Sequence, residues 1–298
     1  MQMQQQTVVG LGEMLWDLLP TGKALGGAPA NFAYHAMSLG DRGVPVSRIG
    51  DDELSSELEN VLQDWHISVE ALQIDPVHPT GTVDVEIDSL GQPCYLIVED
   101  VAWDNIEWTD ALDRLATGCD AVCFGSLAQR RMPSRRTIQR FLAAVPDQTV
   151  RIFDVNIRQH YCSRAILESS LALADVVKLN QAELGKVARV LGIGETATHE
   201  TAYAMLQAYA LDLVCVTLAD QGSWLVTAEA IDVHPGGAVD VADAVGAGDA
   251  FTAALCHHYL KGSDLPTINR AANELGAWVA SQFGATPPPR HGLLADIR

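Results

Sequence analysis

The chain has 298 residues, and 48% of them are hydrophobic, which is enough to form a sizeable buried core. Its formal net charge is −19, so its surface repels nucleic acid and anionic membranes. No apolar run reaches the roughly 18 residues that a membrane span needs, and the polar, uncharged start is unlike a signal peptide. We therefore expect a cytoplasmic protein whose partners are small molecules.

The N-terminal region predicts a buried strand and a second extended segment. Thr7–Glu13 is mostly apolar, but Leu15 stands where a dinucleotide-binding fingerprint begun at Gly10 needs its third glycine. The apolar segment 14–20 contains one carboxylate, Asp17. This carboxylate either lies on a solvated strand face or is held for the hydroxyl group of a ligand.

A helix is predicted to follow, from Pro29 to about Leu39. Proline suits the first turn of a helix, and Gly40 is typical of a helix end. Asn31 projects from the first turn, where its amide either satisfies the helix start or contacts a ligand.

Residues 80–98 predict a β-hairpin that pairs with the strand around 15–19. Thr80–Asp88 alternates apolar and polar residues, and Pro93–Val98 returns after a turn at Ser89–Gln92. Such a hairpin has one solvated face and one apolar face, and the apolar face needs a cover. Trp103 follows the hairpin and either stacks on a ligand or fills the core.

Strands and helices alternate along most of the remaining chain. This pattern predicts a mostly parallel sheet with helices on both faces. We expect strands at Val44–Ile49, Ala121–Gly125, Thr149–Asp154, Val176–Leu179, Leu213–Thr217 and Gly222–Thr227. We expect helices at Asp51–His66, Pro133–Ala144, Arg164–Ala172, Ala182–Leu191, Thr201–Ala210 and Leu265–Gln282.

Polar residues follow several of these strands, at the carboxyl ends where ligands of parallel sheets bind. Arg158 follows the third strand, where its guanidinium either clamps an anion or forms a surface ion pair. Asn180 and Glu183 follow the fourth strand and also fit a capping box at a helix start. Thr217 and Gly222 bound the turn after the fifth strand.

The stretch Ala242–Leu255 combines two glycines, two carboxylates and a run of helix formers. Gly246 and Gly248 permit a tight turn, and the first N–H groups of the following helix then form an anion site. Asp249 lies in the first turn of that helix. It either complements the helix dipole or orients a hydroxyl nucleophile for phosphoryl transfer. We expect the helix start to keep Asp249 ionised, and therefore a weak base.

Two segments carry a family resemblance, Gly26-Gly27-Ala28-Pro29-Ala30-Asn31 and Asp243-Ala244-Val245-Gly246-Ala247-Gly248-Asp249. Together they resemble the signatures of ribokinase-like (PfkB) carbohydrate kinases, most of all the fructokinases, and their order and separation also match. Ala219 and Ala244 replace a Gly and a Thr that are usual in this family. The resemblance implies a ribokinase-like α/β fold with one kinase domain over 1–298. It also implies a small antiparallel β lid formed by about 14–24 and 80–104, and we expect this lid to form a homodimer.

The resemblance implies an ATP-dependent kinase that phosphorylates a primary hydroxyl of a sugar. Fructose is favoured, while ribose, 2-keto-3-deoxygluconate and nucleosides remain open. Asp249 would accept the hydroxyl proton, and the amides of Gly246, Ala247 and Gly248 would stabilise the developing charge. The intact Asp249 argues against a sugar-binding regulatory protein that has lost catalysis.

Further roles follow from the same resemblance. The sugar would contact Asp17, Gly27, Asn31, Trp103 and Arg158. The nucleotide would contact Asn180, Glu183, Thr217, Gly222 and Asn273, and Asn180 and Glu183 would hold water and Mg²⁺ near its phosphates. Asp243 would lie near a monovalent-cation site suited to K⁺.

Other classes of protein lack their signatures here. The P-loop sequence Gly-x-x-x-x-Gly-Lys-[Ser/Thr] is absent, and so is the dinucleotide fingerprint of an oxidoreductase. The six scattered cysteines are interpreted as buried free thiols in preference to a zinc site.

Overall fold

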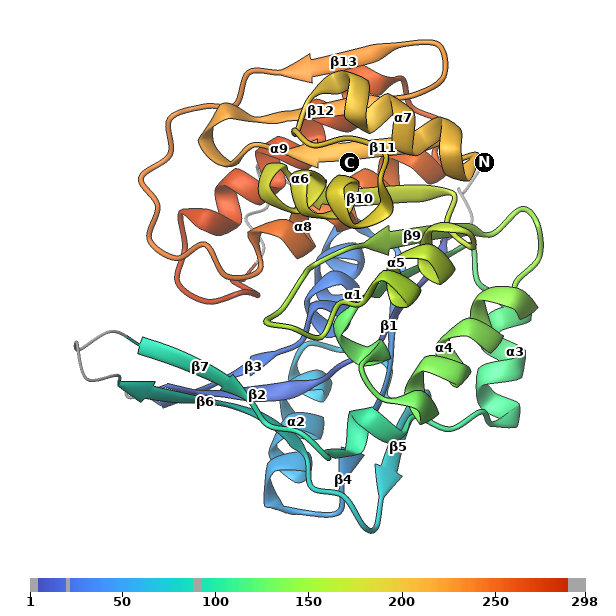
Figure 1. The fold of residues 1–298 in the computed structure, drawn as a ribbon. Coiled ribbons are helices and arrows are strands. Elements are labelled where there is room, and N and C mark those ends of the chain that lie inside the picture. The colour runs from blue at the N-terminus through green and yellow to red at the C-terminus, as the bar shows by residue number, and fades with distance from the viewer. Residues whose placement is uncertain (1–4, 20–21, 88–92, 289–298) are drawn as a thin grey trace.

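A nine-stranded sheet forms the centre of the molecule, in the order β13-β12-β11-β10-β9-β8-β1-β4-β5 (Figure 1). The structure is a computed structural model that describes residues 5–19, 22–87 and 93–288. β12 and β13 are antiparallel to their neighbours, and the other pairs of this sheet are parallel. The predicted mostly parallel sheet is confirmed. Its strands are β1 (Thr7–Leu11), β4 (Arg42–Gly50), β5 (Leu72–Asp75), β8 (Ala121–Gly125), β9 (Val150–Asp154), β10 (Val176–Asn180), β11 (Leu213–Thr217), β12 (Ser223–Val226) and β13 (Ile231–His234).

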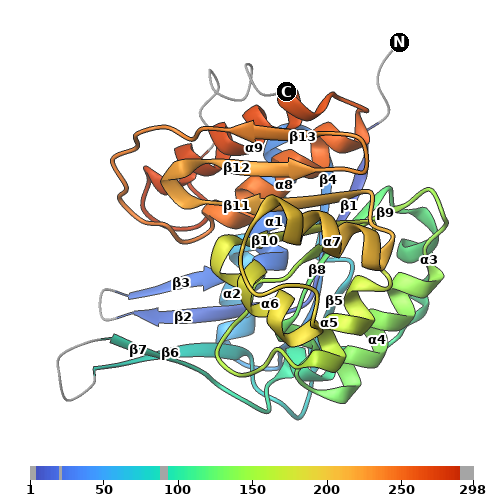
Figure 2. The same cartoon turned by 45° about the horizontal axis from the view of Figure 1, so that its top comes forward.

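Helices cover both faces of this sheet, as the alternating pattern predicts (Figure 2). One face packs against α1 (Ala28–Leu39), α8 (Ala247–Leu260) and α9 (Leu265–Ala280), through a core that includes Phe32, Phe251 and Leu275. The core on the other face includes Phe141, Val187 and Met205. Its helices are α3 (Asp110–Gly118), α4 (Met132–Ala144), α5 (Arg164–Leu171), α6 (Gln181–Leu191) and α7 (His199–Tyr209).

A smaller sheet of four strands, in the order β3-β2-β6-β7, extends from the body to one side (Figure 1). Its strands are β2 (Leu15–Leu19), β3 (Gly22–Gly26), β6 (Gly81–Ile87) and β7 (Pro93–Ile97). The predicted pairing of the hairpin with the segment around 15–19 is confirmed, and β2 and β6 run parallel while the other two pairs are antiparallel. The predicted turn at 89–92 lies outside the described residues.

A third core cluster joins the base of the small sheet to the body. Trp16 of β2 packs there with Tyr34 of α1 and with Leu58 and Leu62 of α2 (Glu53–Asp64). The small sheet is therefore anchored at the end of β1, beside the start of α1. None of the helices in the described part of the chain has the length and apolar character that crossing a bilayer requires.

Candidate active site

The early and late motifs of the sequence meet at the starts of α1 and α8. The side-chain amide of Asn31 donates a hydrogen bond to Oδ2 of Asp249, with an Nδ2–Oδ2 distance of 2.8 Å. A narrow cavity there is lined by Pro29 from the early motif, Asp249 from the late motif, and Asp154 at the end of β9. The structure thus brings together residues that lie more than 90 positions apart in the sequence, at the carboxyl edge of the sheet.

The turn before α8 has the form expected of an anion site. Gly246 is left-handed, with φ 77°, and caps α8 without any side-chain hydrogen bond. A Cβ atom at this position would lie 2.5 Å from the Cα of Ala285, so only glycine fits. The first N–H groups of a helix have no intrahelical acceptor, and no side chain caps these. The Ala247 amide makes one long bond of 3.4 Å, to the carbonyl of Ala244.

Asp249 is a stronger base than its position at a helix start predicts. Burial, the largest cause, and the nearby carboxylate of Asp154 together raise the pKa of Asp249 to about 6, against Asn31, Lys178 and Arg158, which lower it. The expected weak base is therefore corrected: desolvation and a second carboxylate outweigh the helix dipole. At neutral pH Asp249 is still mainly ionised and has a pKa suited to accepting a proton.

Glu13, which the sequence did not single out, is a second carboxyl group in this site. It follows β1, is only 3% exposed, and its Oε2 has no hydrogen-bond partner among the described residues. Burial, the largest cause, and the charge of Asp249 raise the pKa of Glu13 to about 7, against a backbone hydrogen bond and the charges of Arg158 and Arg130, which lower it. A glutamate directly after a buried central strand was the available signal.

Asp17, on β2 of the small sheet, and Arg158, in the loop after β9, both lie beside the cavity at Asp249. Asp17 is half-buried on β2, and its Oδ2 occupies the space that a Cβ on Gly26 would need, 2.6 Å away. Burial raises the pKa of Asp17, and the charge of Arg158 lowers it. Arg158 is exposed, and its charge acts on the carboxyls of Glu13, Asp17 and Asp249.

Gly27 and Trp103 both have structural roles at this site. Gly27 precedes α1 with φ 109°, and a Cβ there would lie 2.5 Å from the carbonyl oxygen of Glu13. Trp103 is fully buried in the core, and the guanidinium of Arg130 covers its ring at 4.0 Å. Of the two alternatives for Trp103, the structure supports the core role, because no face of the indole is open to a sugar.

The start of α6 is a complete capping box. Oδ1 of Asn180 accepts from the Glu183 amide at 2.9 Å, and Oε2 of Glu183 accepts from the Asn180 amide at 2.8 Å. Oε1 of Glu183 accepts from the amide of Ile157 at 2.7 Å, which links α6 to the loop that carries Arg158. Both oxygens of Glu183 are thus already bonded, which fits a cation held through water better than one held directly. The described residues contain no group of three His, Cys, Asp or Glu side chains that could hold a metal ion.

The turn after β11 keeps its glycine-like shape even where alanine replaces glycine. Ala219 is left-handed, with φ 55°, a conformation that is unfavourable for a residue with a Cβ. Gly222 has φ 84°, and a Cβ there would lie 2.0 Å from the carbonyl oxygen of His234. Thr217 ends β11 immediately before this turn. The turn therefore lies where the sequence predicts it, with strain at Ala219.

Asn273 and Asp243 are both engaged by neighbouring protein groups. The amide of Asn273 donates to Oγ of Ser223 at 2.7 Å, which ties α9 to β12. The carboxylate of Asp243 accepts from the amide of Val245 at 3.0 Å and from the amide of Gly284 at 3.1 Å. Asp243 therefore organises the two loops that flank the start of α8. The described cysteine side chains are free thiols: Cys119, Cys123, Cys162, Cys215 and Cys256.

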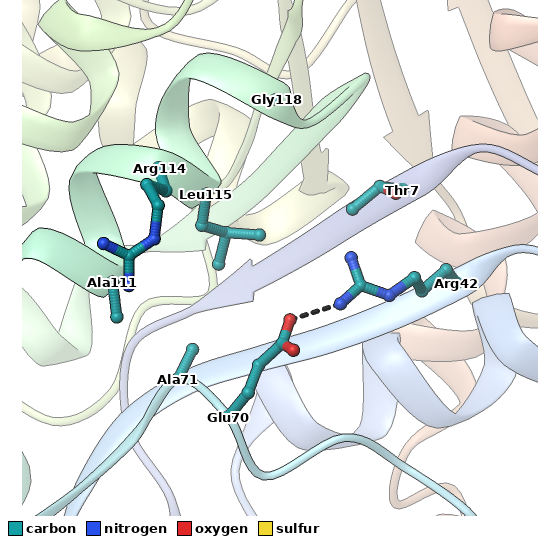
Figure 3. Close-up of a pocket in the computed structure, with 8 residues that line it drawn as sticks. All are labelled: Thr7, Arg42, Glu70, Ala71, Ala111, Arg114, Leu115 and Gly118. Atoms are coloured by element: carbon teal, nitrogen blue, oxygen red, sulfur yellow. Dashed lines mark hydrogen bonds and ion pairs between the residues drawn. The ribbon is translucent and has the colours of Figure 1, made fainter.

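A separate hollow of about 310 Å³ lies at the opposite ends of β1 and β4 (Figure 3). Its lining includes Arg42, Arg114 and Leu115, and Arg42 forms an ion pair with Glu70 across it. None of the predicted site residues lies there. The hollow is therefore distinct from the cavity beside Asp249.

Comparisons with known proteins agree with this geometry. Residues 20–291 match the model of the pfkB family carbohydrate kinases. The chain is 30% identical over 310 residues to the uncharacterized sugar kinase PH1459 of Pyrococcus horikoshii, covering 98% of this chain and 95% of that protein. It is 27% identical to a fructokinase of Vibrio alginolyticus, covering 92% of each.

Solved structures with ligands share the fold. The P. horikoshii protein in complex with ATP superimposes with a TM-score of 0.81 at 27% identity, covering 99% of this chain and 100% of that chain. A double mutant of the fructokinase of Vibrio cholerae, with fructose, ADP and potassium ion bound, gives a TM-score of 0.81 at 27% identity, covering 99% and 98%.

Proposed function

Because this chain belongs to the pfkB family of carbohydrate kinases, we propose that it transfers the γ-phosphoryl group of ATP to a primary hydroxyl of fructose. The coarser activity, that of a phosphotransferase acting on an alcohol group of a sugar, is that of the family. The observation that carries the proposal is the 2.8 Å hydrogen bond from Asn31 to Asp249. It joins the residue expected to contact the sugar to the residue expected to take its proton.

The transfer needs one proton acceptor and one anion site. The hydroxyl oxygen attacks the γ-phosphorus as its proton passes to Asp249, and the bond from that phosphorus to the bridging oxygen breaks, so that ADP leaves with the electron pair. The amides at Gly246, Ala247 and Gly248 stabilise the negative charge on the transferring group. The raised pKa of Asp249, about 6, makes it a better acceptor than an exposed aspartate.

Unpaired polar atoms around the site support a ligand rich in hydroxyl groups. Oε2 of Glu13 and Oδ1 of Asn31 are buried acceptors, and Nη1 of Arg130 is a buried donor, and none of them has a partner among the described residues. Buried polar atoms without partners are rare in proteins, because each loses its hydrogen bonds to water. Hydroxyl groups both donate and accept, so a sugar, with Asp17 and Arg158 at its other side, satisfies both kinds of atom.

The nucleotide and its cations would lie along the neighbouring helix starts and turns. Thr217, Gly222 and Asn273 would bound the nucleoside. Glu183, with Asn180, would hold Mg²⁺ through water, since both Glu183 oxygens already accept backbone amides. Mg²⁺ commonly keeps several waters and binds substrate phosphates, and there it supplies positive charge. Asp243, which is fixed by two amides, is our proposed residue beside a K⁺ site.

Fructose is favoured by two observations. Several of the relatives are fructokinases, and Asp154-Val155-Asn156-Ile157-Arg158 starts at the last residue of β9 and ends with Arg158, whose charge acts on Asp17 and Asp249. The test is ADP release with MgATP and a panel of fructose, ribose, 2-keto-3-deoxygluconate and a nucleoside. Turnover with fructose alone supports the proposal. Turnover with another sugar corrects the substrate, and binding without turnover favours a regulatory protein.

We also propose a homodimer formed through the small sheet, in a single-domain protein of the cytoplasm. Leu96 of this sheet is 47% exposed, and the strand register places it on the same face as the partly buried Leu18, so part of the apolar surface of that face is uncovered in one chain. Light scattering at micromolar concentration should give twice the mass of one chain, and substituting both leucines with serine should give a monomer. A monomeric wild type would contradict the dimer.

A further inference from the structure

A buried ion pair lies directly beneath the turn that precedes α8. Nζ of Lys178 is 3.2 Å and 3.1 Å from the two carboxylate oxygens of Asp154, and the two residues are only 8% and 4% exposed. The hydroxyl of Thr252 lies 3.0 Å from Oδ2 of Asp154 and 2.9 Å from the carbonyl oxygen of Gly248. The ends of β9 and β10 are thus joined to the first turn of α8.

The ammonium group of Lys178 packs against the turn itself. A Cβ at Gly248 would lie 3.0 Å from Nζ, so the absence of a side chain there lets the cation approach the backbone. A protein with a formal net charge of −19 needs local positive charge to hold a nucleotide phosphate. Lys178 places such a charge beneath the proposed anion site, where water screens it little.

The pair also acts on Asp249, with two effects of opposite sign. The carboxylate of Asp154 raises the pKa of Asp249, and the ammonium of Lys178 lowers it. Burial alone would lower the pKa of Lys178, but Asp154, Asp249 and Glu183 raise it, so Lys178 is charged at neutral pH. The titratable and charged groups that face Asp249 are Glu13 after β1, Cys123 on β8, Asp154 on β9, Arg158 in the following loop and Lys178 on β10.

We propose that Lys178, paired with Asp154, is a positioning residue that sets the charge balance of Asp249 and of the turn at Gly248 for phosphoryl transfer. This inference rests on the proposed function, in which Asp249 is the base. A purely structural ion pair would hold β9 and β10 together without any effect on the ionisation of Asp249. The pH profile of the reaction separates the two roles.

The experiment compares the wild type with Lys178→Met, Asp154→Asn and the double variant, by measuring kcat/KM for the sugar from pH 5 to 9 at saturating MgATP. Lys178→Met removes the charge that lowers the pKa of Asp249. The fall of kcat/KM on the acid side of the pH profile should therefore move to higher pH by about one unit. Asp154→Asn should move this fall to lower pH than in the wild type. The double variant should lie between Asp154→Asn and the wild type, because Asp154 has the larger effect on Asp249.

The inference is supported if the pH at which kcat/KM falls is higher in Lys178→Met and lower in Asp154→Asn than in the wild type, with the double variant between Asp154→Asn and the wild type. It is overturned if all four proteins lose activity at the same pH. Lys178→Met leaves an unpaired buried carboxylate and can fail to fold. In that case the comparison of Asp154→Asn with the double variant still tests the inference. These two proteins differ only in the charge of Lys178, so a difference in the pH at which their activity falls is due to that charge. Asp249→Asn serves as the reference: if it keeps wild-type activity, the proposed function fails, whatever the other variants do.

Discussion

Two helix starts lie at the same edge of the sheet and are built in opposite ways. α6 begins with Asn180 and Glu183, whose side chains satisfy the first backbone N–H groups of their own helix. α8 begins with a left-handed glycine, Gly246, and no side chain caps it. Its first-turn carboxylate, Asp249, bonds instead to Asn31 of another helix.

The difference shows where a ligand can be bound. A capping box stabilises a helix start by about 1 kcal/mol and leaves its donors occupied. A glycine start gives up that stabilisation and leaves donors for an anion. The half-buried Asp249 adds to this loss, because its raised pKa means that folding disfavours its charged form. The start of α8 is thus built for chemistry, and the start of α6 is built first for stability.

Asp249→Asn should have the largest effect on the open helix start. Asparagine keeps the shape of the side chain but cannot accept the hydroxyl proton, so kcat should fall at least about 10²-fold. The melting temperature should rise, because a charge that folding partly desolvates is removed. ATP binding should change little. A folded variant with kcat within a few fold of the wild type would leave Asp249 as a helix-start carboxylate only.

Gly246→Ala should disturb the start of α8 in a second way, by lowering both the stability of the protein and its activity. The new Cβ would lie 2.5 Å from the Cα of Ala285, in a backbone conformation that alanine disfavours. We expect the free energy of unfolding to fall by about 2–4 kcal/mol and kcat/KM for ATP to fall more than tenfold. Gly192→Ala is the matched control, since Gly192 has φ 75° but open space around its Cβ position. Equal losses in both variants would show that packing against Ala285 is unimportant.

Asn180→Ala should have the smallest effect, on the capped start. Loss of the cap should lower the free energy of unfolding by about 1 kcal/mol. If Asn180 and Glu183 also hold Mg²⁺ through water, the Mg²⁺ concentration for half-maximal activity should rise about tenfold. Thr109→Ala removes the cap of α3 and is the control for stability alone. Identical Mg²⁺ dependence in both variants would limit Asn180 to its capping role.

The glycine-capped start of α8 was predictable from local sequence patterns, but the pKa of Asp249 within it was not. The spacing of Gly246, Gly248 and Asp249 and the alternation of Thr80–Asp88 are properties of short segments, so the sequence alone indicates them. The pKa of Asp249 depends on burial and on Asp154, which joins it only through the fold. Lys178 has no local signal either, because a lysine in an apolar strand is usually expected at the surface.

Several short elements were also not predicted. β5 and β13 have four residues each, too few to show an alternating pattern. β3, Gly22–Gly26, begins and ends with glycine, which is uncommon within strands, and it is held by pairing with β2. α3 lies in a polar segment whose apolar face becomes clear only where Leu112 and Leu115 enter the core. In each case tertiary contacts decide the structure.

The central claim, that Asp249 is the base, is tested most directly by the pH dependence of kcat/KM for the sugar at saturating MgATP. Asp249 must be deprotonated to act, and burial raises its pKa to about 6, so activity should fall as the pH decreases through about 6. The pKa of the neighbouring Glu13 is raised to about 7, so Glu13 is already mostly protonated where Asp249 titrates, and Glu13→Gln should leave the fall in activity near pH 6. A single fall in activity near pH 6, in the wild type and in this variant, is the predicted result. A profile that stays flat from pH 5 to 8 in a folded enzyme would contradict the account.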